Sequence, residues 1–122
     1  MKTSHDPRHK NRQRAIQALY AWSFQPQSKQ DNDLAAQVVS HLTKIDKLVK
    51  LSAPSRPIEQ INRIDLSILR LAIFELVEKK SLPFKVAVDE AVELAKEFGA
   101  DSSPGFVNGA LGNLVNILKL DK

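Results

Sequence analysis

The sequence has no cysteine, only four glycines, and a single tryptophan and a single tyrosine among 122 residues. Without cysteine there is neither a disulfide nor a thiolate ligand for a metal. No apolar run approaches the roughly 18 residues that a membrane-spanning helix needs, and no signal-peptide core follows Met1. These absences exclude disulfide-stabilised and membrane-spanning classes, and they favour a protein of the cytoplasm.

What is present is ordinary for a globular protein, with 43% hydrophobic and 26% charged residues. The length fits a single domain over residues 1–122. The formal excess of +4 falls within residues 1–14, where Asp6 is the only acid and the bases are Lys2, Arg8, Lys10, Arg12 and Arg14. Such a basic arm on a neutral body suggests an anionic polymer as partner, although a solvated terminus is the alternative.

Apolar residues recur at helical spacing along the chain, with little of the alternation typical of strands. Asp6 and Pro7 predict a helix start, because Asp caps helices and Pro suits the first helical position. This helix runs to Phe24 and takes the basic arm into it, with Ile16, Leu19 and Tyr20 on its apolar face. A polar linker at 25–33 follows. We expect further helices over 33–51, 65–80, 84–98 and 104–118, and a short turn at 55–61.

The 65–80 helix, for which Asp65 is the expected cap, carries apolar residues on several sides. A helix of that kind is buried by several neighbours. We therefore place it at the centre of an all-α bundle.

All four glycines lie in the segment 98–112. A phosphate-binding P-loop needs a preceding strand and a Lys after its last glycine, whereas Phe106 follows Gly105 and a helix precedes Gly99. Gly99 instead fits a left-handed residue that ends a helix. Ser103-Pro104 then fits the start of the next helix. The segment predicts a turn between two helices and no nucleotide site.

Gly105, Gly109 and Gly112 fall on one face of the last helix. Each glycine inside a helix costs about 1 kcal/mol relative to alanine. Three on one line favour a close helix–helix crossing, and a surface for a ligand is the other interpretation.

No residues form a convincing catalytic or metal site. The acidic run of the 84–98 helix is interpreted as a solvated face: Asp89, Glu90, Glu93 and Glu97. The histidines His5, His9 and His41 lack zinc spacing, and no Ser or Thr lies in a nucleophile motif. We predict no enzyme, no cofactor and no metal.

Basic side chains precede Tyr20 and Trp22 on the first helix. Cations bind phosphates and aromatic faces stack on unpaired bases. Both aromatics are, however, more often residues of a core or of a helix interface.

Several segments resemble the NusB family of bacterial transcription antitermination factors. The opening helix of that family is similar to RQRAIQALYAWSFQ, and its central helix to INRIDLSILRLAIFEL. Its C-terminal signature is similar to LPFKVAVDEAVELAKEFGADSSPGFVNGALGNL, and KIDKLVK is a weaker match. The resemblance implies a compact bundle of about five to seven helices in two halves, and an RNA-binding role without catalysis.

The resemblance also implies partners. Family members pair with a small-subunit ribosomal protein, called NusE in this role, bind boxA RNA, and act in the transcription elongation complex on ribosomal RNA operons. By matching positions it implies partner contact at Glu75 and RNA contacts at Arg8, His9, Lys10, Arg12, Tyr20 and Phe106. Formation of a homodimer stays open. The alternative is a helical interaction module, related to those of ribosomal RNA methyltransferases, without its own RNA function.

The sequence departs from the family pattern in three places. The segment Gln25–Asp33 is short where many members carry an additional helix, which points to a reduced amino-terminal half. Pro104-Gly105 replaces polar or basic residues before FVNG, and Asn113 replaces a basic residue. The last two changes remove charge near Phe106, so they leave the C-terminal part of the RNA surface an open question.

Overall fold

The computed structural model describes residues 6–79 and 82–121, and these form six α-helices, one short 3-10 helix and no strand. The elements in order are α1 (Pro7–Phe24), α2 (Asp33–Ser40), α3 (Leu42–Ser52), η1 (Ile58–Gln60), α4 (Arg63–Glu78), α5 (Phe84–Phe98) and α6 (Ser103–Leu118). The predicted all-α bundle is confirmed. No helix in this described part of the chain has the length and hydropathy to cross a bilayer.

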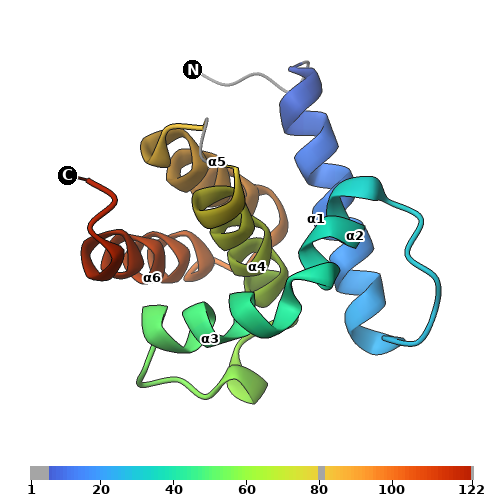
Figure 1. Cartoon of the computed structure of the whole chain (residues 1–122), viewed down its shortest axis with the longest axis horizontal. Helices are drawn as coiled ribbons and strands as arrows, with labels where there is room; N and C mark the ends of the chain where they lie inside the picture. The colour runs from blue at the N-terminus through green and yellow to red at the C-terminus, as the bar shows by residue number, and fades with distance from the viewer. Residues whose placement is uncertain (1–5, 80–81, 122) are drawn as a thin grey trace.

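Helix α4 lies at the centre of the bundle and packs against α1, α2, α3, α5 and α6 (Figure 1). Its middle is buried on every side, from Leu66 to Leu76 with the exception of Arg70. The predicted central position is therefore confirmed. The predicted cap is wrong, because Asn62 Oδ1 accepts hydrogen bonds from the N–H groups of Ile64 (2.8 Å) and Asp65 (3.4 Å). Asp65 lies in the first turn, where its negative charge suits the helix N-terminus.

The predicted 33–51 helix is interrupted at His41, which separates α2 from α3. The Gln37 carbonyl should accept from the His41 N–H, but the Ser40 hydroxyl (2.8 Å) and His41 Nδ1 (2.8 Å) occupy that oxygen. The His41 N–H instead donates a hydrogen bond to the Val38 carbonyl oxygen. Local side-chain hydrogen bonds thus compete with the helix and break it.

The other boundaries follow the sequence signals closely. Asp6 Oδ1 accepts from the Arg8 N–H (2.9 Å) ahead of Pro7, so α1 starts and ends as predicted. Helix α5 has the predicted bounds, and α6 starts one residue before the predicted Pro104. The segment between Phe24 and Asp33 holds no helix, as expected of a polar linker.

The predicted left-handed conformation of Gly99 is wrong, because its φ is −94°. A close contact explains the glycine instead. A Cβ at this position would lie 2.5 Å from Ser103 Cβ and 2.8 Å from the Ala95 carbonyl oxygen. Ser103 is held there because its hydroxyl oxygen accepts from the Ala100 N–H (2.9 Å).

The predicted helix crossing at Gly105, Gly109 and Gly112 is also wrong. All three are exposed, and a Cβ added at any of them would meet nothing within 4 Å. This face of α6 is open.

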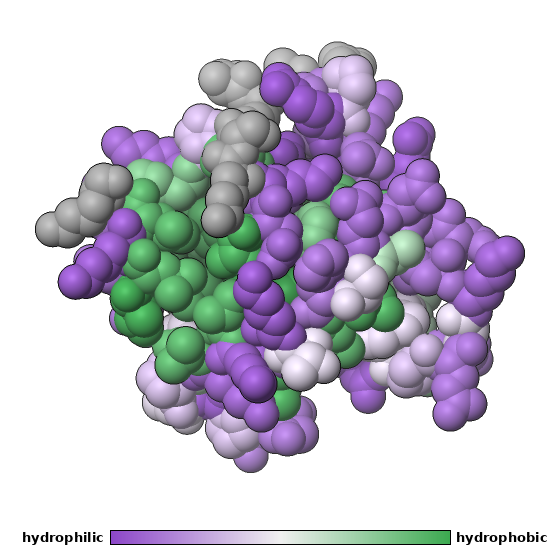
Figure 2. All heavy atoms as spheres, viewed as in Figure 1, coloured by the Kyte–Doolittle hydropathy of each residue, from purple (hydrophilic) through white to green (hydrophobic). Residues whose placement is uncertain are grey.

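An apolar groove of about 690 Å³ lies between α3, α4, α5 and the end of α6. Its lining comprises Lys44, Leu48, Leu76, Val77, Leu82, Pro83, Phe84, Leu118 and Leu120. Figure 2 shows apolar side chains gathered on this side of the molecule, over α6 and its neighbours. Exposed apolar areas of this kind are typical of protein interaction surfaces.

Candidate functional site

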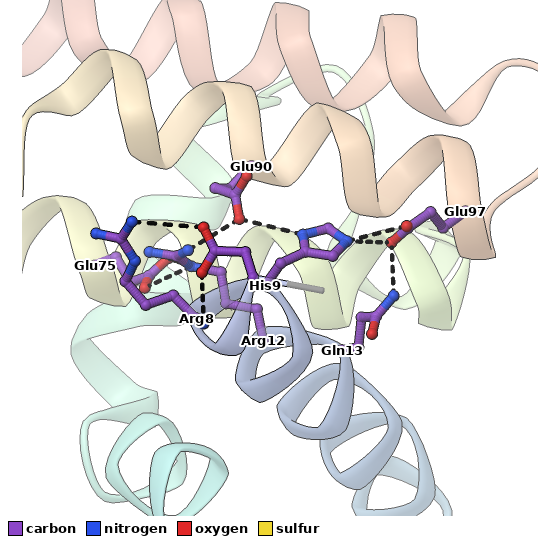
Figure 3. Close-up of polar contacts among 8 residues, drawn as sticks. Arg8, His9, Arg12, Gln13, Glu75, Glu90 and Glu97 are labelled. Atoms are coloured by element: carbon purple, nitrogen blue, oxygen red, sulfur yellow. Dashed lines mark hydrogen bonds and ion pairs between the residues drawn. The ribbon is translucent and has the colours of Figure 1, made fainter. Parts of the chain in front are cut away.

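The part of the basic arm that lies in α1, residues 8–14, has an inner and an outer face. His9 and Arg12 are three residues apart, so they point the same way, toward α4 and α5 (Figure 3). They are 3% and 7% exposed. Arg8 and Lys10 are exposed. Of the four predicted RNA contacts in the arm, two are therefore buried and two face solvent.

Arg12 joins three helices through its guanidinium. Its Nε donates to the two carboxylate oxygens of Glu75 on α4, at 3.1 and 3.0 Å. Its Nη1 donates to Glu90 Oε1 on α5, at 2.9 Å. Both carboxylates are buried, so the interaction is a salt bridge inside the protein rather than on its surface.

His9 completes this cluster, which comprises four buried residues, His9, Arg12, Glu75 and Glu90, and the exposed Glu97. Its Nδ1 lies 3.3 Å from Glu90 Oε1, and its Nε2 lies 2.9 and 3.0 Å from the Glu97 oxygens. Because each ring nitrogen faces a carboxylate, the protonated imidazolium, which donates from both nitrogens, fits best. Burial alone lowers the pKa of His9, but the hydrogen bonds and charges of Glu97 and Glu90 outweigh it, so this pKa is raised.

Glu75, the predicted partner contact, is 5% exposed. Burial raises the pKa of Glu75, and the opposing effects of Arg12 and Lys79 only partly offset it. Glu75 lines a small pocket of about 210 Å³ together with Arg8, Asn11, Arg12, Leu34, Lys79 and Leu82. Its carboxylate is thus directed into the cluster and borders a narrow opening.

The raised pKa of His9 predicts how stability depends on pH. The folded protein holds this proton more tightly than the unfolded chain, so the stabilisation is complete below the ordinary pKa of 6.5 and is lost as pH rises through the higher folded pKa. We expect the free energy of unfolding in urea to fall as the pH rises above this ordinary pKa. In His9→Gln the free energy of unfolding should lack this pH-dependent decrease. An equal fall in both proteins would contradict the protonated cluster.

The prediction that Glu90 faces solvent is wrong, since it is 1% exposed beneath α1. The sequence held a signal, because Ala87, Ala91 and Leu94 surround it at helical spacing and are all buried. Glu97 lies at the rim of the cluster, where Gln13 Nε2 also donates to it (3.3 Å).

The outer face of α1 changes from basic to aromatic along the helix. Lys10 and Arg14 are exposed in its first half. Tyr20, expected on the apolar face, is instead 38% exposed and contacts the edge of Phe24, with ring centroids 5.0 Å apart. The guanidinium of Arg63 lies 4.2 Å from the centre of the Phe24 ring.

Phe106 lies apart from this face, on α6. It is half-buried, and the guanidinium of Arg56 lies 4.2 Å from the centre of its ring. The structure thus brings His9, Arg12 and Glu75 together, while Tyr20 and Phe106 stay on separate helices. Arg56 was not predicted, and its position beside Phe106 leaves no local signal in the sequence.

Comparisons with known proteins agree with this architecture. The NusB family model matches residues 31–116. Two proteins named transcription antitermination protein NusB are similar. The one from Shewanella oneidensis is 38% identical over 88% of this chain and 94% of its own length. The one from Pectobacterium carotovorum is 40% identical over 85% of this chain and 88% of its own length.

Solved structures show the same fold. NusB from T. maritima superposes with a TM-score of 0.83 at 27% identity and covers 95% of this chain and 93% of that one. A chain in the crystal structure of a plectonemic RNA supercoil has a TM-score of 0.80 at 21% identity, and the match covers 92% of this chain and 96% of that one. The family consists of transcription antitermination factors that are not enzymes, in agreement with the prediction. Because its sequence matches the family model over most of its length and its helices superpose on those of a NusB, this chain belongs to the NusB family.

Proposed function

We propose that this chain is a transcription antitermination factor that binds single-stranded boxA-type RNA together with NusE. It acts within the transcription elongation complex and promotes processive transcription of ribosomal RNA operons. Family membership supports the general role. The observation that carries the RNA role is the outer face of α1.

On that face Lys10, Gln17 and Phe24 are seven residues apart, which places them on nearly one line. Within the described part of the chain, neither Lys10 nor Arg14 forms an ion pair, so their charges are available to phosphates. Tyr20 offers a partly exposed ring at the other end, on which a base can stack. Phosphate contacts and stacking surfaces therefore follow one another along a single helix.

The predicted contacts that are buried, His9, Arg12 and Glu75, have other roles in this proposal. His9 and Arg12 stay predictions as direct RNA contacts, and their burial favours a positioning role that sets which residues of α1 face outward. Glu75 stays a prediction as the contact to NusE, which would reach it through the small pocket beside Lys79.

The test is a titration of fluorescent boxA-type RNA at several salt concentrations, with and without NusE. We expect Arg8→Ala/Lys10→Ala to bind about tenfold more weakly, and the salt slope to fall by about 0.7 for each cation removed. The matched control, Lys85→Ala/Lys96→Ala, removes two exposed charges from α5 and should change neither the RNA affinity nor the salt slope. An unchanged affinity in the α1 variant would refute the arm as the RNA-binding face.

The alternative function is a helical interaction module without its own RNA role. One observation favours it, namely that two of the four basic side chains predicted to contact RNA point into the protein. Recovery of NusE on purified protein, with no RNA binding at physiological salt, would establish this alternative.

A further inference from the structure

We propose that Arg56 is a nucleotide-binding residue, held over Phe106 so that its guanidinium stacks on a base of single-stranded RNA and pairs with a phosphate. This inference rests on the proposed RNA-binding function. It adds to the RNA surface a residue from the turn between α3 and η1, far from the basic arm in sequence.

Arg56 is positioned by a rigid turn. The Arg56 N–H donates to the Ala53 carbonyl (3.2 Å), which closes a four-residue turn with Pro54 at its second position. Proline favours that position because its fixed φ matches the turn. Pro57 then restricts Arg56 itself to an extended backbone. The short stretch from Ala53 to Pro57 therefore holds the Arg56 backbone with little freedom.

Asn113 fixes this turn beside α6. Its Nδ2 donates to the carbonyl oxygens of Leu51 (3.4 Å) and Ser52 (3.2 Å), which are among the unpaired carbonyls at the end of α3. Asn113 lies seven residues after Phe106, two turns along the same face of α6. Asn113, which stands where the family pattern has a basic residue, thus ties α3 to α6 two turns away from the ring that Arg56 covers.

The guanidinium of Arg56 has the chemistry of a nucleotide contact. It is exposed, and its inner face lies 4.2 Å from the centre of the Phe106 ring. Guanidinium planes stack on bases and bind phosphates through their N–H groups. Gly109, one turn beyond Phe106, has no side chain that would obstruct this approach, and a Cβ there would meet nothing within 4 Å.

In the other arginine–aromatic contacts of the described residues, a protein acceptor binds the guanidinium. Arg63, over Phe24, donates to the Ser23 carbonyl at 2.7 Å. Arg70, near Trp22, donates to both oxygens of Asp46 at 2.9 and 3.0 Å. In this part of the chain no protein acceptor binds the guanidinium of Arg56. Its N–H groups are therefore available for a ligand, and its positive charge supplies what Pro104-Gly105 and Asn113 lack.

The experiment compares Arg56→Ala, Arg56→Lys and Phe106→Leu with the unchanged protein in the same RNA titration, with Lys85→Ala as the charge-matched control. We expect Arg56→Ala to weaken binding about tenfold and to reduce the salt slope by about 0.7. Arg56→Lys should keep the slope and lose most of the affinity, because an ammonium group has no plane to stack. Phe106→Leu should weaken binding in the presence of Arg56 and have less effect in Arg56→Lys.

The outcomes separate this inference from the function on which it rests. Full affinity and slope in Arg56→Ala, with the expected weakening in Arg8→Ala/Lys10→Ala, would overturn the role of Arg56 alone. Absence of RNA binding by the unchanged protein would overturn both. Thermal melting of each variant identifies a purely structural role, because such a role would lower the melting temperature of Arg56→Ala and Arg56→Lys without the predicted difference in salt slope.

Discussion

Replacing Arg12 with methionine is expected to lower the free energy of unfolding by about 3–5 kcal/mol, the range observed when one partner of a buried ion pair is removed. The substitution keeps most of the side-chain volume but removes both hydrogen bonds to Glu75 and the one to Glu90. The carboxylate of Glu75 then stays buried with no cation in direct contact. Urea denaturation of both proteins at the same pH measures the loss.

Arg14→Met is the matched control, because Arg14 is exposed on the same helix. Its effect should stay within about 0.5 kcal/mol. Replacing the whole cluster core, as in Arg12→Met/Glu75→Leu/Glu90→Leu, should recover much of the lost stability, since apolar groups of similar size often substitute for buried ions. If Arg12→Met were no more harmful than Arg14→Met, the buried position of the Arg12 guanidinium would be wrong.

The helices that local signals define were predictable. Asp6-Pro7 at the start of α1 and Pro83 before α5 fix backbone positions through caps and proline geometry, and these boundaries are confirmed. The break at His41 was missed because it depends on whether the Gln37 carbonyl binds the Ser40 and His41 side chains or the His41 N–H. A hydrophobic pattern that continues across both helices carries no record of that competition.

The candidate site was predictable in composition but not in orientation. The basic arm is evident from charge, yet the partners of Arg12 lie 63 and 78 residues away in the sequence. Which side of α1 faces inward depends on carboxylates buried on α4 and α5, and a carboxylate is normally expected at the surface. The contact between Arg56 and Phe106 likewise joins the turn after α3 to α6, two segments that packing and the hydrogen bonds of Asn113 bring together.

The second large effect is expected at Gly99. Gly99→Ala should lower the free energy of unfolding by about 1–3 kcal/mol, the range for a side chain forced into filled space. The new Cβ would lie 2.8 Å from the Ala95 carbonyl oxygen and 2.5 Å from Ser103 Cβ, so part of the turn between α5 and α6 has to move. The backbone conformation itself is open to alanine, because φ is −94°.

Gly109→Ala is the matched control with the opposite sign. It lies inside α6 with nothing within 4 Å of an added Cβ, so it should raise the free energy of unfolding by about 1 kcal/mol through helix propensity. A double-mutant cycle then assigns the cause of the loss at Gly99. Because Ser103→Gly removes one of the two clashing groups, Gly99→Ala should be less harmful in that background. Equal harm in both backgrounds would place the conflict wholly at the Ala95 carbonyl, and stabilisation by Gly99→Ala would show that the turn has a different geometry.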